Sequence, residues 1–179
     1  MARLTPLEMT DVTGKALDIY KEIEAAFGKV PNLFKTYAHH PVLLEANWNK
    51  VKTVMMNGAL RDEIKQTIAL LVSKDNGCAY CVAAHLGALK SLGLSNDEIG
   101  RIETNIDEAN FSSREKAIIA FARKANTDPL HVSDDEFQAL RENGVSDAEI
   151  VEALGVMEVF TSFNKFLDSL QVDIDFIND

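Results

Sequence analysis

The chain is poor in cysteine, proline and aromatic residues, and it has no long apolar run. Its 179 residues include two cysteines, four prolines and one tryptophan, and aromatic residues make up 7% of the total. Two cysteines in a chain of this length exclude a disulfide-stapled scaffold. No apolar stretch approaches the roughly 20 residues of a membrane-spanning helix, and the first residues lack the apolar segment of a signal peptide. We therefore expect a cytoplasmic protein.

The chain also has few basic residues for its number of acids. Lys and Arg together number 18 against 28 Asp and Glu, which gives a net charge of −10. Nucleic acids and anionic membranes bind basic surfaces, so this charge argues against both as the main partner. The length and the 46% of hydrophobic residues suffice for one domain, residues 1–179, with a full core. Small molecules or proteins are the expected partners.

Apolar residues follow the helical period along nearly the whole chain, with no sustained alternation of two. Helices are expected over about 17–27, 41–55 and 60–74, and the last one, about 147–170, has so wide an apolar surface that it belongs at the centre or in an oligomer interface. The helix-start pattern Ser/Thr-x-x-Glu occurs at Thr5/Glu8, Ser95/Glu98, Ser112/Glu115, Ser133/Glu136 and Ser146/Glu149. The sequence predicts an all-α protein.

Two segments of the chain resemble each other. Residues 63–99 align without gaps on residues 114–150, with identities that include Gly93/Gly144 and Ser95/Ser146. This alignment indicates a duplicated helical unit in which only the first copy kept its thiols. The alternative is convergence, because helices start and stop by the same capping rules wherever they occur.

Both cysteines and one of the four histidines lie within one segment of ten residues. Cys78, Cys81 and His85 are three and four positions apart, so on a helix they share one face. The turn signal Asn76-Gly77 places the two cysteines in the first turns of that helix, where the helix dipole lowers a thiol pKa. A sulfenic acid on either sulfur would have a resolving partner beside it. A redox-active cysteine pair is the expected chemistry.

The residues alone leave two questions open. The helix dipole and exposure favour Cys78 as the attacking sulfur, whereas a base four residues further on favours Cys81. Zinc is a competing use of the two thiols and the imidazole, but a structural site takes four ligands, and only His39 or His40 could complete it. We therefore expect neither a metal nor a cofactor.

The segment from Leu60 to His85, with its core Cys-x-Tyr-Cys-x-x-x-His, strongly resembles the carboxymuconolactone decarboxylase superfamily in its alkylhydroperoxidase (AhpD-like) branch. The run from Gly28 to Phe34, followed by His40-Pro41, resembles the entry segment of peroxidase-related members. Residues 163–168 resemble their closing helix. The resemblance covers about residues 20–172.

This resemblance implies an AhpD-like helical fold built around a CxxC helix, assembly into trimers or hexamers, and a peroxiredoxin-type peroxidase in antioxidant defence. By the same analogy Cys81 is the peroxidatic thiol, Cys78 is the resolving and reductant-facing thiol, and His85 belongs to the proton relay. The implied partners are a peroxide substrate and a thiol or protein reductant. The decarboxylases of the superfamily lack the cysteine pair, so lactone decarboxylation is disfavoured.

The sequence departs from the family pattern at one position of the relay. The family usually has a glutamate twelve residues before the first cysteine, and Gln66 stands there instead. An amide cannot exchange a proton as a carboxylate does, although Glu63, one helical turn earlier, could supply one. Peroxidase activity is therefore expected to be slow or absent. The alternatives are a redox-responsive ligand-binding or stress protein with little turnover, and another reaction of the same superfamily.

Overall fold

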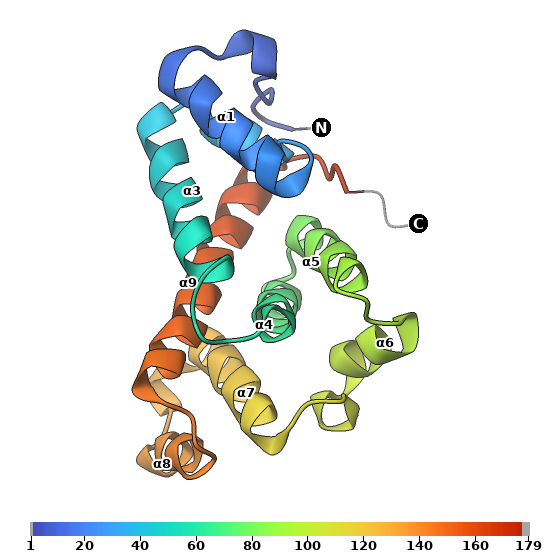
Figure 1. Cartoon of the computed structure of the whole chain (residues 1–179), viewed down its shortest axis with the longest axis vertical. Coiled ribbons are helices and arrows are strands. Elements are labelled where there is room, and N and C mark those ends of the chain that lie inside the picture. The colour runs from blue at the N-terminus through green and yellow to red at the C-terminus, as the bar shows by residue number, and fades with distance from the viewer. Residues whose placement is uncertain (1, 177–179) are drawn as a thin grey trace.

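The structure, a computed structural model, describes residues 2–176, and within them it is all-helical, as the sequence predicts. No strand occurs in this range. The elements are η1 (Met9–Asp11), α1 (Gly14–Phe27), α2 (Asn32–Tyr37), α3 (Pro41–Met55), α4 (Asp62–Asp75), α5 (Ala79–Ser91), α6 (Asn96–Thr104), η2 (Ile106–Glu108), α7 (Ser113–Thr127), η3 (Pro129–His131), α8 (Asp134–Glu142) and α9 (Asp147–Leu170). Figure 1 shows their arrangement, with α1 and the segment that follows α9 at the same end of the molecule.

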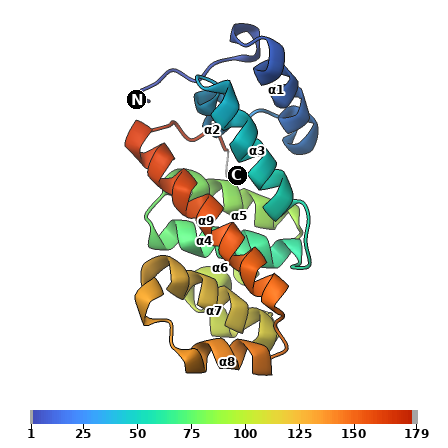
Figure 2. The ribbon, with the colours of Figure 1, turned by 90° about the vertical axis from the view of Figure 1, so that its left-hand side faces the viewer.

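Helix α9 runs along the molecule and holds the other helices together. It packs on α3, α4, α5 and α7, and Figure 2 shows it passing diagonally over α4 and α5. This confirms the central position expected from its broad apolar surface. Neither α9 nor any other helix in the described range is long and apolar enough to cross a membrane.

Helix α4 is the most enclosed element. It packs against α5, α7 and α9, and nine of its fourteen residues are buried. The apolar run from Ile68 to Val72 is buried on every side of the helix, which an amphipathic pattern alone would not produce. Since α4 is followed directly by α5, its position fixes where the CxxC segment lies.

Four of the five predicted helix starts are confirmed. Ser95, Ser112, Ser133 and Ser146 each cap a helix and form a capping box with the glutamate three residues on. The prediction at Thr5/Glu8 is wrong. The backbone N–H of Leu7 donates to the carbonyl of Lys35 in α2, which keeps this segment out of a helix.

The two aligned segments correspond helix by helix. Helix α4 matches α7, α5 matches α8, and α6 matches the start of α9. The correspondence fails where the cysteines lie, because the first turn of α5 has η3 as its counterpart and α8 begins later. Pro129 begins η3, and proline favours a short turn of this kind over a continued helix here.

A row of aromatic rings leads from the CxxC helix to α3. His85 packs edge-on against Phe160 at 4.3 Å between ring centroids, and Phe160, Phe163, Phe34 and Trp48 follow as successive contacts. Phe34 and Trp48 are thus core residues, as their sequence environment favours.

A buried ion pair ties the loop after α3 to α9. Glu152 of α9 accepts from the backbone N–H groups of Ala59 at 2.8 Å and Leu60 at 3.3 Å. Its Oε1 lies 2.9 Å from the ammonium of Lys65, which is only 2% exposed and also donates to the carbonyl of Asn57. A buried cation and a carboxylate with this many partners fix the loop against α9.

Gly58 is the residue on which this arrangement depends. Its φ of +109° lies in the left-handed region, and a Cβ built there would meet the Glu152 carboxylate at 2.2 Å. We expect Gly58→Ala to lower the free energy of unfolding by about 3 kcal/mol, because backbone strain adds to the displacement of a buried carboxylate. Urea unfolding measures this. The control is Gly100→Ala within α6, where nothing lies within 4 Å. A similar loss in both variants would contradict the role of Glu152.

Candidate active site

A tight turn between α4 and α5 sets the position of both cysteines. Gly77 adopts a φ of +77°, and the Cys78 N–H then donates to the carbonyl of Ser73 at 2.9 Å. Cys78 is the N-cap residue of α5 and Cys81 lies in its first turn. The Asn-Gly signal therefore brings both sulfurs to the positive end of the α5 dipole.

Both thiols are buried and free. Cys78 is 0% exposed, Cys81 is 3% exposed, and no disulfide joins them. The Cys81 thiol donates to the Cys78 sulfur, which lowers the pKa of Cys78. The same contact with Cys78, together with burial, raises the pKa of Cys81. In the reduced pair Cys78, nearer the end of the helix, is thus the more acidic thiol.

His85 is a neutral base enclosed by protein. Its Nδ1 lies 2.7 Å from Gln66 Oε1, and burial lowers its pKa to about 3. Because an amide oxygen can only accept, Nδ1 carries the proton and the lone pair is on Nε2. That Nε2 is buried and has no hydrogen-bond partner among the described residues. A buried polar atom without a partner is rare and often marks a functional site.

The structure brings four of the five predicted site residues together. Cys78, Cys81 and His85 lie along α5, and Gln66 reaches His85 from α4. Glu63 lies elsewhere. Its carboxylate is 3.7 Å from Arg61, and no hydrogen bond joins it to Gln66 or His85 in the described part of the chain.

A buried polar network that the sequence did not indicate surrounds Cys81. Asn164 of α9 is 1% exposed and donates to Ser73 Oγ at 3.1 Å, and its Oδ1 accepts from Asn76 at 2.9 Å. The Asn76 amide pairs in turn with Asn126 of α7. Asn164 and Ser73 both contact the Cys81 sulfur, where they oppose the rise in its pKa.

The remaining candidates have structural partners. The Tyr80 hydroxyl donates to Asp175 at 2.7 Å and accepts from the Leu33 N–H, so Tyr80 packs away from the sulfurs. His39 Nε2 lies 2.9 Å from the Thr5 carbonyl, and His40 Nδ1 accepts from the Leu43 N–H at the start of α3. In residues 2–176 no group of three or more His, Cys, Asp or Glu side chains could hold a metal ion.

A family model matches the part of the chain that contains the cysteine pair of this candidate site. The sequence model of the carboxymuconolactone decarboxylase family matches residues 42–124, which include α4, the cysteine pair and His85. Just under half of the chain, including the whole cysteine motif, is thus similar to this family. A comparison with curated proteins gives no match.

Solved structures show that the chain has the AhpD-like fold. An alkylhydroperoxidase AhpD core, peroxidase-related protein from Ralstonia eutropha JMP134, superposes with a TM-score of 0.87 at 24% identity, over 97% of this chain and 92% of that one. A peroxidase-related protein from Silicibacter sp. TM1040 gives 0.85 at 24%, over 96% and 91%. The debrominase Bmp8, in complex with 2,3,4-tribromopyrrole, gives 0.82 at 20%, over 96% and 90%.

Sequence reasoning missed Ser73, Asn164 and Asp168 as site residues. Ser73 and Asn164 touch Cys81, and Asp168 touches Cys78. One available signal was the resemblance of residues 163–168 to a closing helix of the superfamily. Another was the position of Asn164 within an apolar helix, since a buried polar side chain needs a hydrogen-bond partner.

The low pKa of His85 makes stability depend on pH. Below about 6.5 the unfolded chain protonates this imidazole, whereas the folded protein does so only near pH 3. The unfolded state therefore binds the extra proton between these values, and stability falls as the pH is lowered, by about 1.4 kcal/mol per pH unit from this group. Urea unfolding between pH 7 and pH 5 should show this slope reduced in His85→Gln. Equal slopes in both proteins would mean that His85 is charged when folded.

Proposed function

We propose that this protein is a thiol-dependent peroxidase of the AhpD type, in which Cys81 attacks a peroxide and Cys78 resolves the product. The observation that carries the proposal is the unpartnered Nε2 of neutral His85, one helical turn from Cys81. A neutral base in the same enclosed site as a protonated thiol can take the thiol proton directly or through one water, as nucleophile activation requires. The family resemblance supports the same assignment of the two sulfurs.

In the proposed cycle the Cys81 thiol proton passes to His85 Nε2 through one water, and the thiolate attacks one peroxide oxygen. The S–O bond forms as the O–O bond breaks, two electrons pass from sulfur to the peroxide, and the leaving alkoxide takes up a proton. Cys78, as thiolate, then attacks the Cys81 sulfenic sulfur, and the S–O bond breaks with release of hydroxide, which takes up a proton to become water. The product is a Cys78–Cys81 disulfide, which a thiol reductant opens again.

Asn164 and Ser73 supply the anion stabilisation that this cycle needs. Asn164 has one amide hydrogen on Ser73 and keeps the other for Cys81, because its oxygen is held by Asn76. A thiolate in a buried site needs such fixed donors, since water cannot solvate it.

The weak point of the mechanism is the basicity of His85. An imidazole whose pKa is about 3 accepts a proton reluctantly, and Gln66 cannot stabilise the imidazolium as a carboxylate would. The same observation favours a second candidate function, a redox-responsive protein of low turnover in which disulfide formation changes the packing of α5.

Peroxide consumption coupled to a thiol reductant tests the proposal. We expect slow turnover by the wild type and none by Cys81→Ser. Gln66→Glu should raise the rate about 10-fold or more, because a carboxylate beside Nδ1 raises the pKa of His85 toward neutrality. Dimedone labelling of the sulfenic acid should appear on residue 81 in Cys78→Ser and be absent from Cys81→Ser.

Two results would overturn the peroxidase proposal. One is wild type without turnover together with no gain in Gln66→Glu, which would favour the redox-responsive protein. The other is sulfenic acid on Cys78 in Cys81→Ser, which would reverse the sulfur roles. Replacing peroxide by a brominated pyrrole in the same assay separates peroxide reduction from an activity like that of the debrominase neighbour.

Asn164 can be tested separately from the cysteines. In a Cys78→Ser background, Asn164→Ala should slow the reaction of Cys81 with peroxide about 10-fold and raise the pKa of its thiol, because one charge-assisted hydrogen bond is lost. Stopped-flow oxidation across pH gives both quantities. Thr161→Val is the control, since Thr161 lies on the same helix and bonds only the far end of the network, at Asn126. Equal effects of the two variants would reduce the role of Asn164 to packing.

A further inference from the structure

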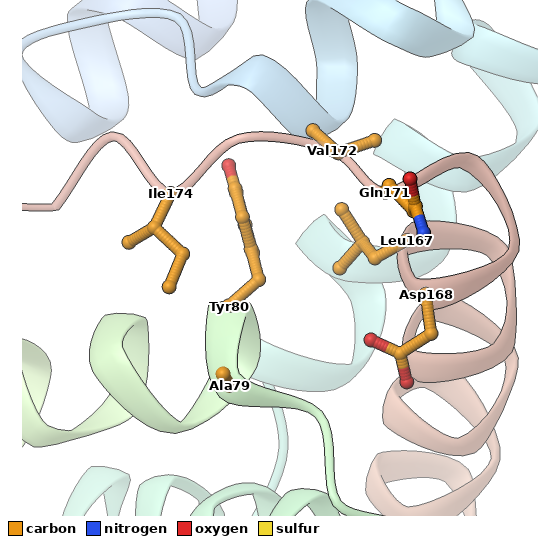
Figure 3. A pocket seen from close by; sticks show the side chains of 7 residues that line it. All are labelled: Ala79, Tyr80, Leu167, Asp168, Gln171, Val172 and Ile174. Atoms are coloured by element: carbon orange, nitrogen blue, oxygen red, sulfur yellow. The ribbon is translucent and has the colours of Figure 1, made fainter. Parts of the chain in front are cut away.

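A recess of about 280 Å³ lies beside the first turn of α5, at the Cys78 end of the pair. Ala79 and Tyr80 of α5 form one wall, and Leu167 and Asp168 of α9 form another. The segment after α9, which includes Ile174, closes the third side (Figure 3). Because Ala79 follows Cys78 directly, the recess adjoins Cys78 and not His85.

Asp168 is the one charged side chain among the residues that line the recess. It is exposed, projects from α9 into the recess in Figure 3, and forms no ion pair with any described residue. The nearby Asp175 differs, because Lys29 pairs with it at 3.6 Å and the Tyr80 hydroxyl donates to it. Asp168 therefore gives the recess an uncompensated negative charge.

Asp168 also touches the sulfur that the recess adjoins. The Cys81 thiol is the main influence that lowers the pKa of Cys78, and a hydrogen bond between Asp168 and Cys78 opposes it. Cys78 itself is 0% exposed. A molecule that approaches this sulfur from the recess therefore meets the Asp168 carboxylate.

We propose that this recess receives the thiol that reduces the Cys78–Cys81 disulfide, and that Asp168 selects an uncharged or cationic thiol over an anionic one. The inference rests on the proposed function, since only an oxidised pair needs a reductant. Like charges within a few ångströms repel strongly in a partly enclosed site, so an anionic thiolate carrying a second negative group is disfavoured.

The chemical step is a thiol–disulfide exchange. The thiolate of the reductant attacks Cys78 Sγ, a mixed disulfide forms, and the bond to Cys81 breaks with release of a Cys81 thiolate that takes up a proton. A second thiol of the reductant then attacks the mixed disulfide and frees Cys78, so two electrons pass from the reductant to the protein. Attack falls on Cys78 because the recess adjoins this sulfur, and Ser73 and Asn164 donate hydrogen bonds to the departing Cys81 thiolate.

The test starts from the full chain oxidised with diamide, so that it needs no peroxide. Reduction is followed by alkylation and mass spectrometry with neutral dithiothreitol, cationic cysteamine and anionic 3-mercaptopropionate. For each thiol we compare the rate constant of Asp168→Asn with that of the wild type, because this ratio cancels the intrinsic reactivity of the thiol. Glu158→Gln removes an equal charge from an exposed position on the same helix and is the control.

We expect Asp168→Asn to speed reduction by 3-mercaptopropionate and to slow reduction by cysteamine, each by about 3- to 10-fold at low salt, with little change for dithiothreitol. Asp168→Glu, which keeps the charge, should behave as wild type, and Glu158→Gln should change no ratio by more than about 2-fold. Salt at 0.5 M should shrink the differences.

Equal Asp168→Asn ratios for the three thiols would overturn the selection by Asp168. If diamide forms no disulfide, the recess has no substrate and both proposals fail together. If Asp168→Asn changes the rates of the anionic and cationic thiols in opposite directions but no peroxide is consumed, the reductant site stands and the peroxidase proposal fails.

Discussion

The enclosure of α4 is the constraint from which the site follows. A helix packed against α5, α7 and α9 must satisfy the polar side chains of its enclosed faces inside the protein, because buried polar groups need partners. Lys65 does so through Glu152, Gln66 through His85, and Ser73 through Asn164. The partners of α4 thus define both the tie between the loop and α9 and the surroundings of the cysteine pair. Among the buried side-chain polar atoms of α4, only Thr67 Oγ1 has no hydrogen-bond partner in the described part of the chain.

The helices could largely be predicted from the sequence, because apolar period and capping residues are local signals. The last helix spans 147–170 as expected, and four serine caps begin helices where predicted. Helix α2 was not predicted, since six residues are too short to display a period. That α4 lies deepest was also not predicted, because burial on all sides depends on which helices pack around it.

The candidate site also has one part that residue spacing predicts and another that depends on tertiary packing. The shared face of Cys78, Cys81 and His85 follows from their spacing, and the contact of Gln66 with His85 agrees with its expected place in the site. Asn164 could not be found by spacing, because it reaches Cys81 from a helix more than eighty residues later in the chain. The lower pKa of Cys78 relative to Cys81 likewise depends on tertiary structure. It depends on the donation by the Cys81 thiol and on burial, and the helix dipole adds to it.

The two aligned halves of the chain differ most in the length of their third helix. Helix α6 ends after nine residues, whereas α9 continues to twenty-four, and both Asn164 and Asp168 lie in that continuation. The half without thiols therefore provides the wall against which the other half holds its sulfurs. Shortening α9 to the length of α6 would leave the cysteine motif complete in sequence and open to solvent. The cysteine motif and the part of α9 that covers it lie in different segments of the chain. A chain can therefore keep the motif while the covering helix changes.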